Sequence, residues 1–244
     1  MARRRFFVEQ VRNMRASLEG EAAEHLRRVL RAEPGQRYEL SDNRSVYLAE
    51  IEGFAPGRVL FRIVEELPAE QQPLRLTLGA SLIKFDRFEW MIEKVTELGV
   101  ERIIPILAAR SEKGLAQAAV KRLERWRRIA REASQQARRA RLPVITPPEE
   151  FASAVAEVSN CRFFLDEARL GRPLLGALPA ASARDCADQV ALLVGPEGGW
   201  TEQERTAAEE AGWQAVCLGR CVLRAETAAM AAVAVLVNAW LAEA

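Results

Sequence analysis

Two short stretches decide the fold: Gly195-Pro196-Glu197-Gly198-Gly199-Trp200-Thr201, and further on Leu218-Gly219-Arg220-Cys221-Val222-Leu223-Arg224. The first follows the unbroken apolar segment Val190–Val194, and the second ends the segment Ala215–Leu218. Continuous apolar runs are typical of strands buried on both faces of a parallel sheet. Each stretch then leads into a segment with helical periodicity. Strand, loop and helix in this order predict an α/β domain with a mostly parallel sheet.

The same alternation extends outward over residues 74–244. Strands are expected at Leu74–Leu78, Arg102–Leu107 and Cys161–Leu165. Helices are expected at Asp86–Leu98, Thr201–Ala211 and Glu226–Leu241. Asp86 is a candidate N-cap for the first helix, and Thr201 with Glu204 forms the sequence pattern of a capping box for the second.

The N-terminal third has a different pattern, with short strands at Arg5–Val8, Tyr38–Leu40, Val46–Glu52 and Val59–Val64 and a helix at Glu21–Arg31. Short strands joined by tight turns predict a small β-barrel. The polar, proline-containing stretch 65–73 is typical of a linker. We therefore expect two domains, 1–68 and 74–244.

Composition excludes several chemistries. The 244 residues include one histidine, His25, and four cysteines with no Cys-x-x-Cys pair, so zinc peptidase, zinc-cluster and thioredoxin-like sites are not expected, and we predict no metal. Neither a secretory signal nor an apolar run of about 18 residues is visible. The sequence favours a soluble, cytoplasmic protein without membrane association.

The formal net charge is only +1, yet 31 of the 35 basic residues are arginine. An arginine-rich codon usage explains part of this excess, and phosphate recognition is the alternative. Between Lys121 and Arg141, nine basic residues face only Glu124 and Glu132 on an amphipathic helical pattern that ends before Pro143. A solvated surface helix could carry this charge, but we favour a polyanionic partner.

The loops at strand ends are the candidate site. Three glycines in 195–199 let the backbone approach a ligand closely, and the helix that follows adds amide donors. The loop fits neither a Rossmann fingerprint nor a P-loop. In the second loop, Val222 and Leu223 between Arg220 and Arg224 suit an apolar floor with charged edges. Leu165-Asp166-Glu167 ends a third strand, and three converging ends would form one composite pocket.

Together these segments resemble the SPOUT RNA methyltransferases, and within them the family that methylates N3 of a uridine in 16S ribosomal RNA. The resemblance spans nearly the whole chain in order. It rests on GPEGGWTEQE (195–204), LGRCVLRAETAAMAAV (218–233), RRRFFV (3–8), the run from His25 to Arg31, the segment from Lys84 to Val100, the run from Lys121 to Trp126, the segment from Glu132 to Pro143 and Leu165–Glu167.

The resemblance implies an N-terminal PUA-like β-barrel that reads RNA and a C-terminal α/β domain that ends in a deep trefoil knot. It also implies a homodimer and S-adenosylmethionine bound by the knot loops. The cofactor-binding residues expected from the three loops and the last helix are Leu165, Val194, Gly195, Glu197, Gly198, Gly199, Leu218, Gly219, Val222, Leu223 and Ala228.

Methylation at N3 requires loss of a weakly acidic proton, and a nearby cation would lower that cost. Arg224 is the first candidate for the cation. Glu197 or Glu226 is the candidate base, with bulk water as a further alternative. RNA, as 16S ribosomal RNA or the small ribosomal subunit, is expected to contact basic residues outside the loops. These are Arg3, Arg4, Arg5, Lys84, Arg87, Arg138 and Arg139.

Three rival functions remain open at this stage. A ribose 2′-O-methyltransferase would share the knot and use a hydroxyl nucleophile. A non-catalytic RNA-binding protein could retain the scaffold without turnover. An unrelated nucleotide-binding α/β protein is the reading that the loops support least.

Overall fold

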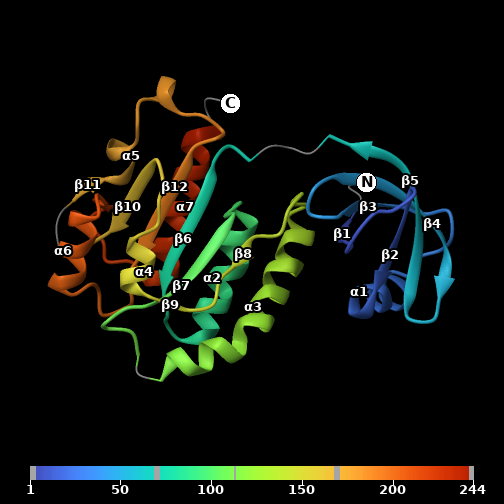
Figure 1. Cartoon of the computed structure of the whole chain (residues 1–244), viewed down its shortest axis with the longest axis horizontal. Coiled ribbons are helices and arrows are strands. Elements are labelled where there is room, and N and C mark those ends of the chain that lie inside the picture. Colours follow the sequence, from blue (N-terminus) through green and yellow to red (C-terminus); the bar gives the residue numbers. More distant parts are fainter. Residues whose placement is uncertain (1–3, 69–71, 113, 168–170, 242–244) are drawn as a thin grey trace. The chain divides into compact units, whose positions relative to one another are not determined.

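The computed structural model describes residues 4–68, 72–112, 114–167 and 171–241 (Figure 1). It contains two compact units. Unit 1 comprises Met1–Glu70 and Arg131–Leu142, and unit 2 comprises Gln71–Ala130 and Pro143–Ala244. The predicted second domain, 74–244, includes residues 131–142, whereas in the structure this segment packs with the first unit.

Unit 1 is built on a five-stranded mixed sheet in the order β1-β3-β4-β5-β2, in which only the β1–β3 pair is parallel. The strands are β1 Arg5–Phe7, β2 Arg15–Glu19, β3 Arg37–Ser41, β4 Val46–Ala55 and β5 Arg58–Leu67. Helix α1 (Gly20–Glu24) continues into a π-helical turn, η1 (His25–Val29), which buries Leu26 against Phe6 and Phe61 in the core. Within the described residues β1 does not pair with β2, so the sheet does not close as the predicted barrel would.

The segment 131–142 is tied to unit 1 by hydrogen bonds to the β3 region. The Ser41 hydroxyl donates to the carbonyl of Ala140, and the Leu142 amide donates to the side chain of Asn43 at 2.9 Å. Arg138 donates to Glu39 at 2.6 Å, although its backbone has a positive φ of 55°. These bonds join residues about a hundred positions apart, which no local sequence pattern could indicate.

Unit 2 contains one parallel sheet in the order β11-β13-β10-β12-β6-β7-β8, with β9 also paired to β7. Its strands are β6 Arg75–Ser81, β7 Arg102–Leu107, β8 Val144–Ile145, β9 Glu149–Glu150, β10 Cys161–Leu165, β11 Arg172–Pro173, β12 Gln189–Val194 and β13 Gln214–Cys217. Its helices are α2 Phe85–Glu97, α3 Leu115–Gln136 (whose end belongs to unit 1), α4 Phe151–Val155, α5 Leu174–Ala177, the short η2 Ala181–Ala183, α6 Glu202–Glu210 and α7 Ala225–Leu241. The predicted α/β fold with a parallel sheet is confirmed.

Helices cover both faces of this sheet, which explains the unbroken apolar strands (Figure 1). Along β12, Val190, Leu192 and Val194 pack with α2, α3 and α7, whereas Ala191 and Leu193 pack with α4 and α6. Alternate side chains of one strand therefore enter two separate cores. Among the described helices, none combines the length and the hydropathy that a membrane span requires.

The two predicted helix starts have different outcomes. Thr201 and Glu204 form the predicted capping box at the start of α6, with both reciprocal bonds present. The expected cap at Asp86 is wrong, because α2 begins at Phe85 and its N-cap, Lys84, makes no side-chain cap bond. Asp86 lies in the first turn, where a negative charge still favours the helix.

Candidate functional site

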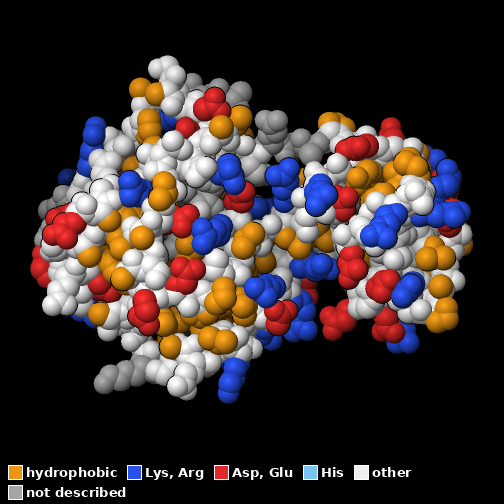
Figure 2. Space-filling model, in the orientation of Figure 1, with side chains coloured by type: hydrophobic (Ala, Val, Ile, Leu, Met, Phe, Trp, Pro, Cys, Tyr) orange, Lys and Arg blue, Asp and Glu red, His pale blue; other side chains and the backbone are white. Residues whose placement is uncertain are grey.

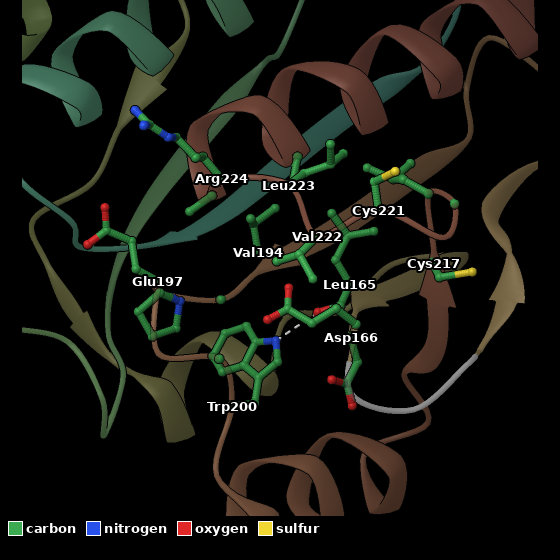
Figure 3. Close-up of a pocket in the computed structure, with 18 of the residues that line it drawn as sticks. Leu165, Asp166, Val194, Glu197, Trp200, Cys217, Cys221, Val222, Leu223 and Arg224 are labelled. Carbon is green, nitrogen blue, oxygen red and sulfur yellow. Dashed lines mark hydrogen bonds between the residues drawn. The ribbon is translucent and has the colours of Figure 1, made fainter.

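A cavity of about 370 Å³ lies in unit 2 where β10, β12 and β13 end (Figure 3). These strands are neighbours in the sheet in the order β13-β10-β12, so their carboxyl ends bring three loops together. Crevices at this edge of a parallel sheet are the usual ligand sites of α/β proteins, and the volume suits a small organic molecule.

The wall of the cavity contains every sequence-predicted cofactor residue except Gly198. Those present are Leu165, Val194, Gly195, Glu197, Gly199, Leu218, Gly219, Val222, Leu223 and Ala228. Gly198 instead lies against Arg110, whose guanidinium donates to its carbonyl at 3.0 Å. The apolar floor comes from strand ends and the 218–224 loop, and the glycine loop supplies bare backbone.

Trp200 joins two of the three loops. Its indole Nε1 donates to the carbonyl of Leu165 at 2.9 Å (Figure 3). Its ring stacks on Phe164 with centroids 4.9 Å apart. A Cβ at position 195 would lie 2.9 Å from the indole Cε2, so only glycine allows this approach. Gly199, with a φ of 67°, makes the turn that brings Trp200 back under the loop.

The end of β10 is fixed by a buried ion pair. Asp166 is 4% exposed and accepts from Arg205 of α6 at 2.7 and 3.2 Å. A buried carboxylate with two guanidinium donors is geometrically well defined. The pair therefore holds Leu165 and Asp166, two residues of the cavity wall, against α6.

Glu197 and Arg224 both extend at one side of the cavity, whereas Asp166 lies beside Leu165, away from them (Figure 3). Arg87 of α2 also lines the wall and forms an ion pair with Glu197. Glu226 is 3% exposed and does not belong to the lining; its Oε1 lies 3.9 Å from Arg87 Nε. Arg224 is exposed and makes no side-chain hydrogen bond or ion pair with the described residues.

The predicted RNA-contacting residues occupy different environments. Arg4 is exposed beside His25, and Lys84 is exposed before α2. Arg5 and Arg138 both pair with Glu39, at 2.9 and 2.6 Å. Arg139 is only 7% exposed, a placement that argues against a phosphate contact. Arg87 lies in the cavity wall, and Arg3 lies outside the described residues.

Many other arginines are paired with carboxylates. In unit 1, Arg37 and Arg62 both contact Glu50 of β4, and Figure 2 shows basic and acidic side chains interspersed over this sheet. In unit 2, Arg122 and Arg125 of α3 both bind Glu89 of α2. Burial alone would raise the pKa of Glu89, but the hydrogen bonds and charges of these two arginines outweigh it and lower the pKa. Part of the positive charge predicted for α3 is thus neutralised.

Several residues of the wall were not predicted individually as cofactor-binding or catalytic residues, although Asp166 and Glu167 belong to a strand end expected at the pocket. These wall residues are Asp166, Glu167, Pro196, Trp200, Val216, Cys217, Cys221 and Ala225. Most of them are next to a predicted residue in the sequence, so their position at the strand ends was the signal that could have identified them as wall residues. For Arg87 the available signal, a basic residue at the start of a helix, indicated RNA instead. Within the described residues, no cluster of His, Cys, Asp and Glu is arranged to hold a metal ion.

The cavity and the parallel sheet define an α/β protein with a small-molecule site at the strand ends, and comparison with known proteins gives the class. An RNA methyltransferase domain model matches residues 70–237. A ribosomal RNA small subunit methyltransferase E from a Synechocystis strain is 35% identical over 230 residues, covering 93% of this chain and 74% of the relative.

Solved structures agree with this class. The crystal structure of a ribosomal RNA small subunit methyltransferase E from Neisseria gonorrhoeae, bound to S-adenosylmethionine, has a TM-score of 0.86 with 31% identity and covers 98% of both chains. A methyltransferase from Legionella pneumophila in complex with the same cofactor has a TM-score of 0.84 and 28% identity, again over 98% of both chains. The chain belongs to the ribosomal RNA small subunit methyltransferase E family of RNA methyltransferases.

Proposed function

We propose that the protein uses S-adenosylmethionine to methylate N3 of a specific uridine in 16S ribosomal RNA of the small ribosomal subunit. The observation that carries the proposal is the 370 Å³ cavity at the ends of β10, β12 and β13, lined by the loops that the family signature predicts. A relative of 31% identity over 98% of the chain binds the same cofactor, which supports this assignment.

The described residues fit the cofactor. Leu165, Val194, Leu218 and Leu223 offer apolar surface to an adenine ring, and Gly195 exposes backbone that a side chain would cover. An apolar pocket with a few placed polar groups is the usual form of such a site. When bound, S-adenosylmethionine supplies an electrophilic methyl group on a sulfonium sulfur, which is left as a neutral thioether.

The chain's own residues position the nucleophile, exclude water and manage charge. Arg224 at the cavity edge is proposed to stabilise the uridine anion. Glu197, which lines the cavity with its side chain 44% exposed, can accept the N3 proton and release it to solvent. Glu226, the other candidate base, is buried outside the lining and is less suited to direct transfer. Bulk water remains the alternative acceptor.

We further propose the arrangement that the family resemblance implies. Residues 1–68 form a PUA-like RNA-binding domain, and residues 74–244 form the methyltransferase domain with a deep trefoil knot through its cofactor loops. The working form is a cytoplasmic homodimer. Arg4 and Lys84 are the exposed members of the proposed RNA footprint, and phosphate contacts of this kind weaken steeply with salt.

The test is methylation of small ribosomal subunits from a strain that lacks this activity, followed by nucleoside mass spectrometry. The expected product is one N3-methyluridine per 16S RNA. A ribose 2′-O-methyl product would identify the other SPOUT chemistry. Failure to bind S-adenosylmethionine by calorimetry would instead indicate a non-catalytic RNA-binding protein. Chromatography with light scattering tests the dimer.

A further inference from the structure

Arg87 contacts two acidic residues, one on the glycine loop and one at the start of helix α7. Its guanidinium pairs with Glu197 of the glycine loop, and its Nε lies 3.9 Å from Oε1 of Glu226 in the first turn of α7. Arg87 itself lines the cavity. A single cation is therefore shared between an exposed carboxylate at the cavity and a buried one behind it.

The two carboxylates hold Arg87 in different ways. The Glu226 side chain is 5% exposed, whereas the Glu197 side chain is 44% exposed. A buried carboxylate requires compensation by a nearby positive charge. Oε2 of Glu226 has no hydrogen-bond partner among the described residues, so the charge of Arg87 is its main visible compensation. Glu197 makes the shorter contact but is exposed, so a ligand can replace it, whereas the buried Glu226 keeps its charge beside Arg87 when Glu197 leaves.

We propose that Arg87 is a catalytic cation of the methyl transfer: on RNA binding it exchanges Glu197 for the uracil ring and stabilises the ring after N3 loses its proton. This inference rests on the proposed function. The N3–H bond breaks with its electron pair left on nitrogen, and the proton passes to the released Glu197 carboxylate. The negative charge then spreads over N3 and the two ring oxygens, which are acceptors for the planar guanidinium fork.

Arg87 suits this role better than an exposed arginine acting alone. Charge stabilisation is most effective when the stabilising group is held in place before the reaction. Arg87 has carboxylates on two sides, Glu197 and the buried Glu226, whereas Arg224 is exposed and makes no side-chain bond with the described residues. Arg224, which precedes α7 in the cavity wall, can still supply a second positive charge to the base. Glu226 becomes a positioning residue, which agrees with its place outside the cavity wall.

The test compares Arg87→Gln with wild type across pH, using single-turnover methylation of small subunits. We expect a loss of about 100-fold at neutral pH. The loss should shrink as pH rises, because hydroxide then supplies the uridine anion that Arg87 no longer stabilises. The affinity for S-adenosylmethionine, measured by calorimetry, should change by less than about threefold, which corresponds to the small free energy of a partly exposed ion pair. A loss that is equal at every pH would overturn the proposal.

A second substrate separates catalysis from structure. RNA carrying 5-fluorouridine at the target has a more acidic N3. This substrate should raise the methylation rate of Arg87→Gln substantially and that of the wild type only slightly. Arg75→Gln is the matched control, since Arg75 pairs with Glu101 on an exposed part of unit 2 away from the cavity. It should behave as wild type.

Two further variants keep the test decisive if Arg87→Gln folds poorly. Arg87→Lys retains the charge without the fork and should lose less activity, with a smaller pH effect. Glu226→Gln should lower the rate, and its effect should largely disappear in an Arg87→Gln background. Equal rates for Arg87→Lys and wild type at all pH values would show that the guanidinium geometry of Arg87 is not needed. If the losses of Arg87→Gln and Glu226→Gln were additive in the double variant, Glu226 would not act through Arg87. If wild type makes no N3-methyluridine, the proposed function itself fails.

Discussion

Helix α2 carries two charged networks, one at Arg87 and one at Glu89. They differ in how many of their carboxylate oxygens are hydrogen-bonded. Glu89 accepts from Arg122 at 2.8 Å and from Arg125 at 2.8 and 2.9 Å, so both carboxylate oxygens are bonded. Arg87, about 200° around the helix, pairs with an exposed Glu197 and stands 3.9 Å from a buried Glu226 whose second oxygen is unpartnered among the described residues.

The difference distinguishes a structural network from a reactive one. Both oxygens of Glu89 are held by guanidinium groups of α3, so its bonds contribute to the stability of α2 against α3. A network with an exchangeable partner and an unpartnered oxygen can rearrange when a substrate arrives. Natural proteins tolerate such unsatisfied buried groups mainly where function uses them.

The largest effect is expected at Arg224, the other cation of the cavity. Arg224→Ala should lower methyl transfer by about 10²–10³-fold, because the variant loses a charge directed at the developing anion. Cofactor affinity should change little, since the glycine loop and apolar floor are unaltered. Single-turnover rates and calorimetry measure the two quantities. A turnover close to wild type would remove Arg224 from the mechanism and leave Arg87 as the cation.

The next effect is expected at Trp200, where one bond ties two cofactor loops. Trp200→Phe keeps a ring over Phe164 but loses the bond from Nε1 to the Leu165 carbonyl. We expect cofactor binding to weaken by about 5–10-fold, the equivalent of one net hydrogen bond of roughly 1 kcal/mol. Calorimetry with S-adenosylmethionine gives the measurement.

Trp213→Phe is the matched control for this substitution. Trp213 also donates its indole N–H to a carbonyl, that of Val155 at 2.8 Å, but it packs in the core with α4 and does not line the cavity. Its loss should lower stability without weakening cofactor affinity. If both variants weakened binding alike, the bond of Trp200 would act through general stability and not through the loops.

Local patterns predicted much of unit 2 and less of its site. Cys161–Leu165 and the capping box at Thr201 were predicted correctly because their signals lie within a few residues of sequence. The strand-end rule placed the 195–199 and 218–224 loops in one cavity. The same rule brought the strand end Leu165-Asp166-Glu167 to the pocket, but the ion pair of Asp166 was not predicted because its partner, Arg205, lies on α6, almost forty positions away.

Unit 1 was harder to predict for the same physical reason. The strand Arg15–Glu19 was missed because it is only five residues long and contains no β-branched or aromatic residue. Residues 131–142 follow a continuous helical pattern, yet bonds to Ser41 and Asn43 place them with unit 1. Arg87 was assigned to RNA because nothing in the sequence shows that Glu197 and Glu226 converge on it.

A smaller effect, on stability only, is expected at Glu89. Glu89→Gln should lower the free energy of unfolding by about 1–2 kcal/mol at neutral pH, because a neutral amide replaces a carboxylate bonded to two guanidinium groups. The two arginines are partly exposed and regain water, which limits the cost. Denaturant unfolding measures the change. Methyl transfer should stay at the wild-type level, unlike in any variant of the Arg87 network.

The smallest effect is the pH dependence of the contribution that Glu89 makes to the free energy of unfolding. The arginines lower the pKa of Glu89 below its ordinary value of 4.5, so the unfolded chain binds this proton more readily than the folded one. The stabilisation is therefore complete above pH 4.5 and is lost as the pH falls through the lower pKa of the folded state. The stability difference between wild type and Glu89→Gln should narrow in that acidic range. A difference that stayed constant down to the acid-unfolding limit would show that Glu89 stabilises α2 through packing and not through its charge.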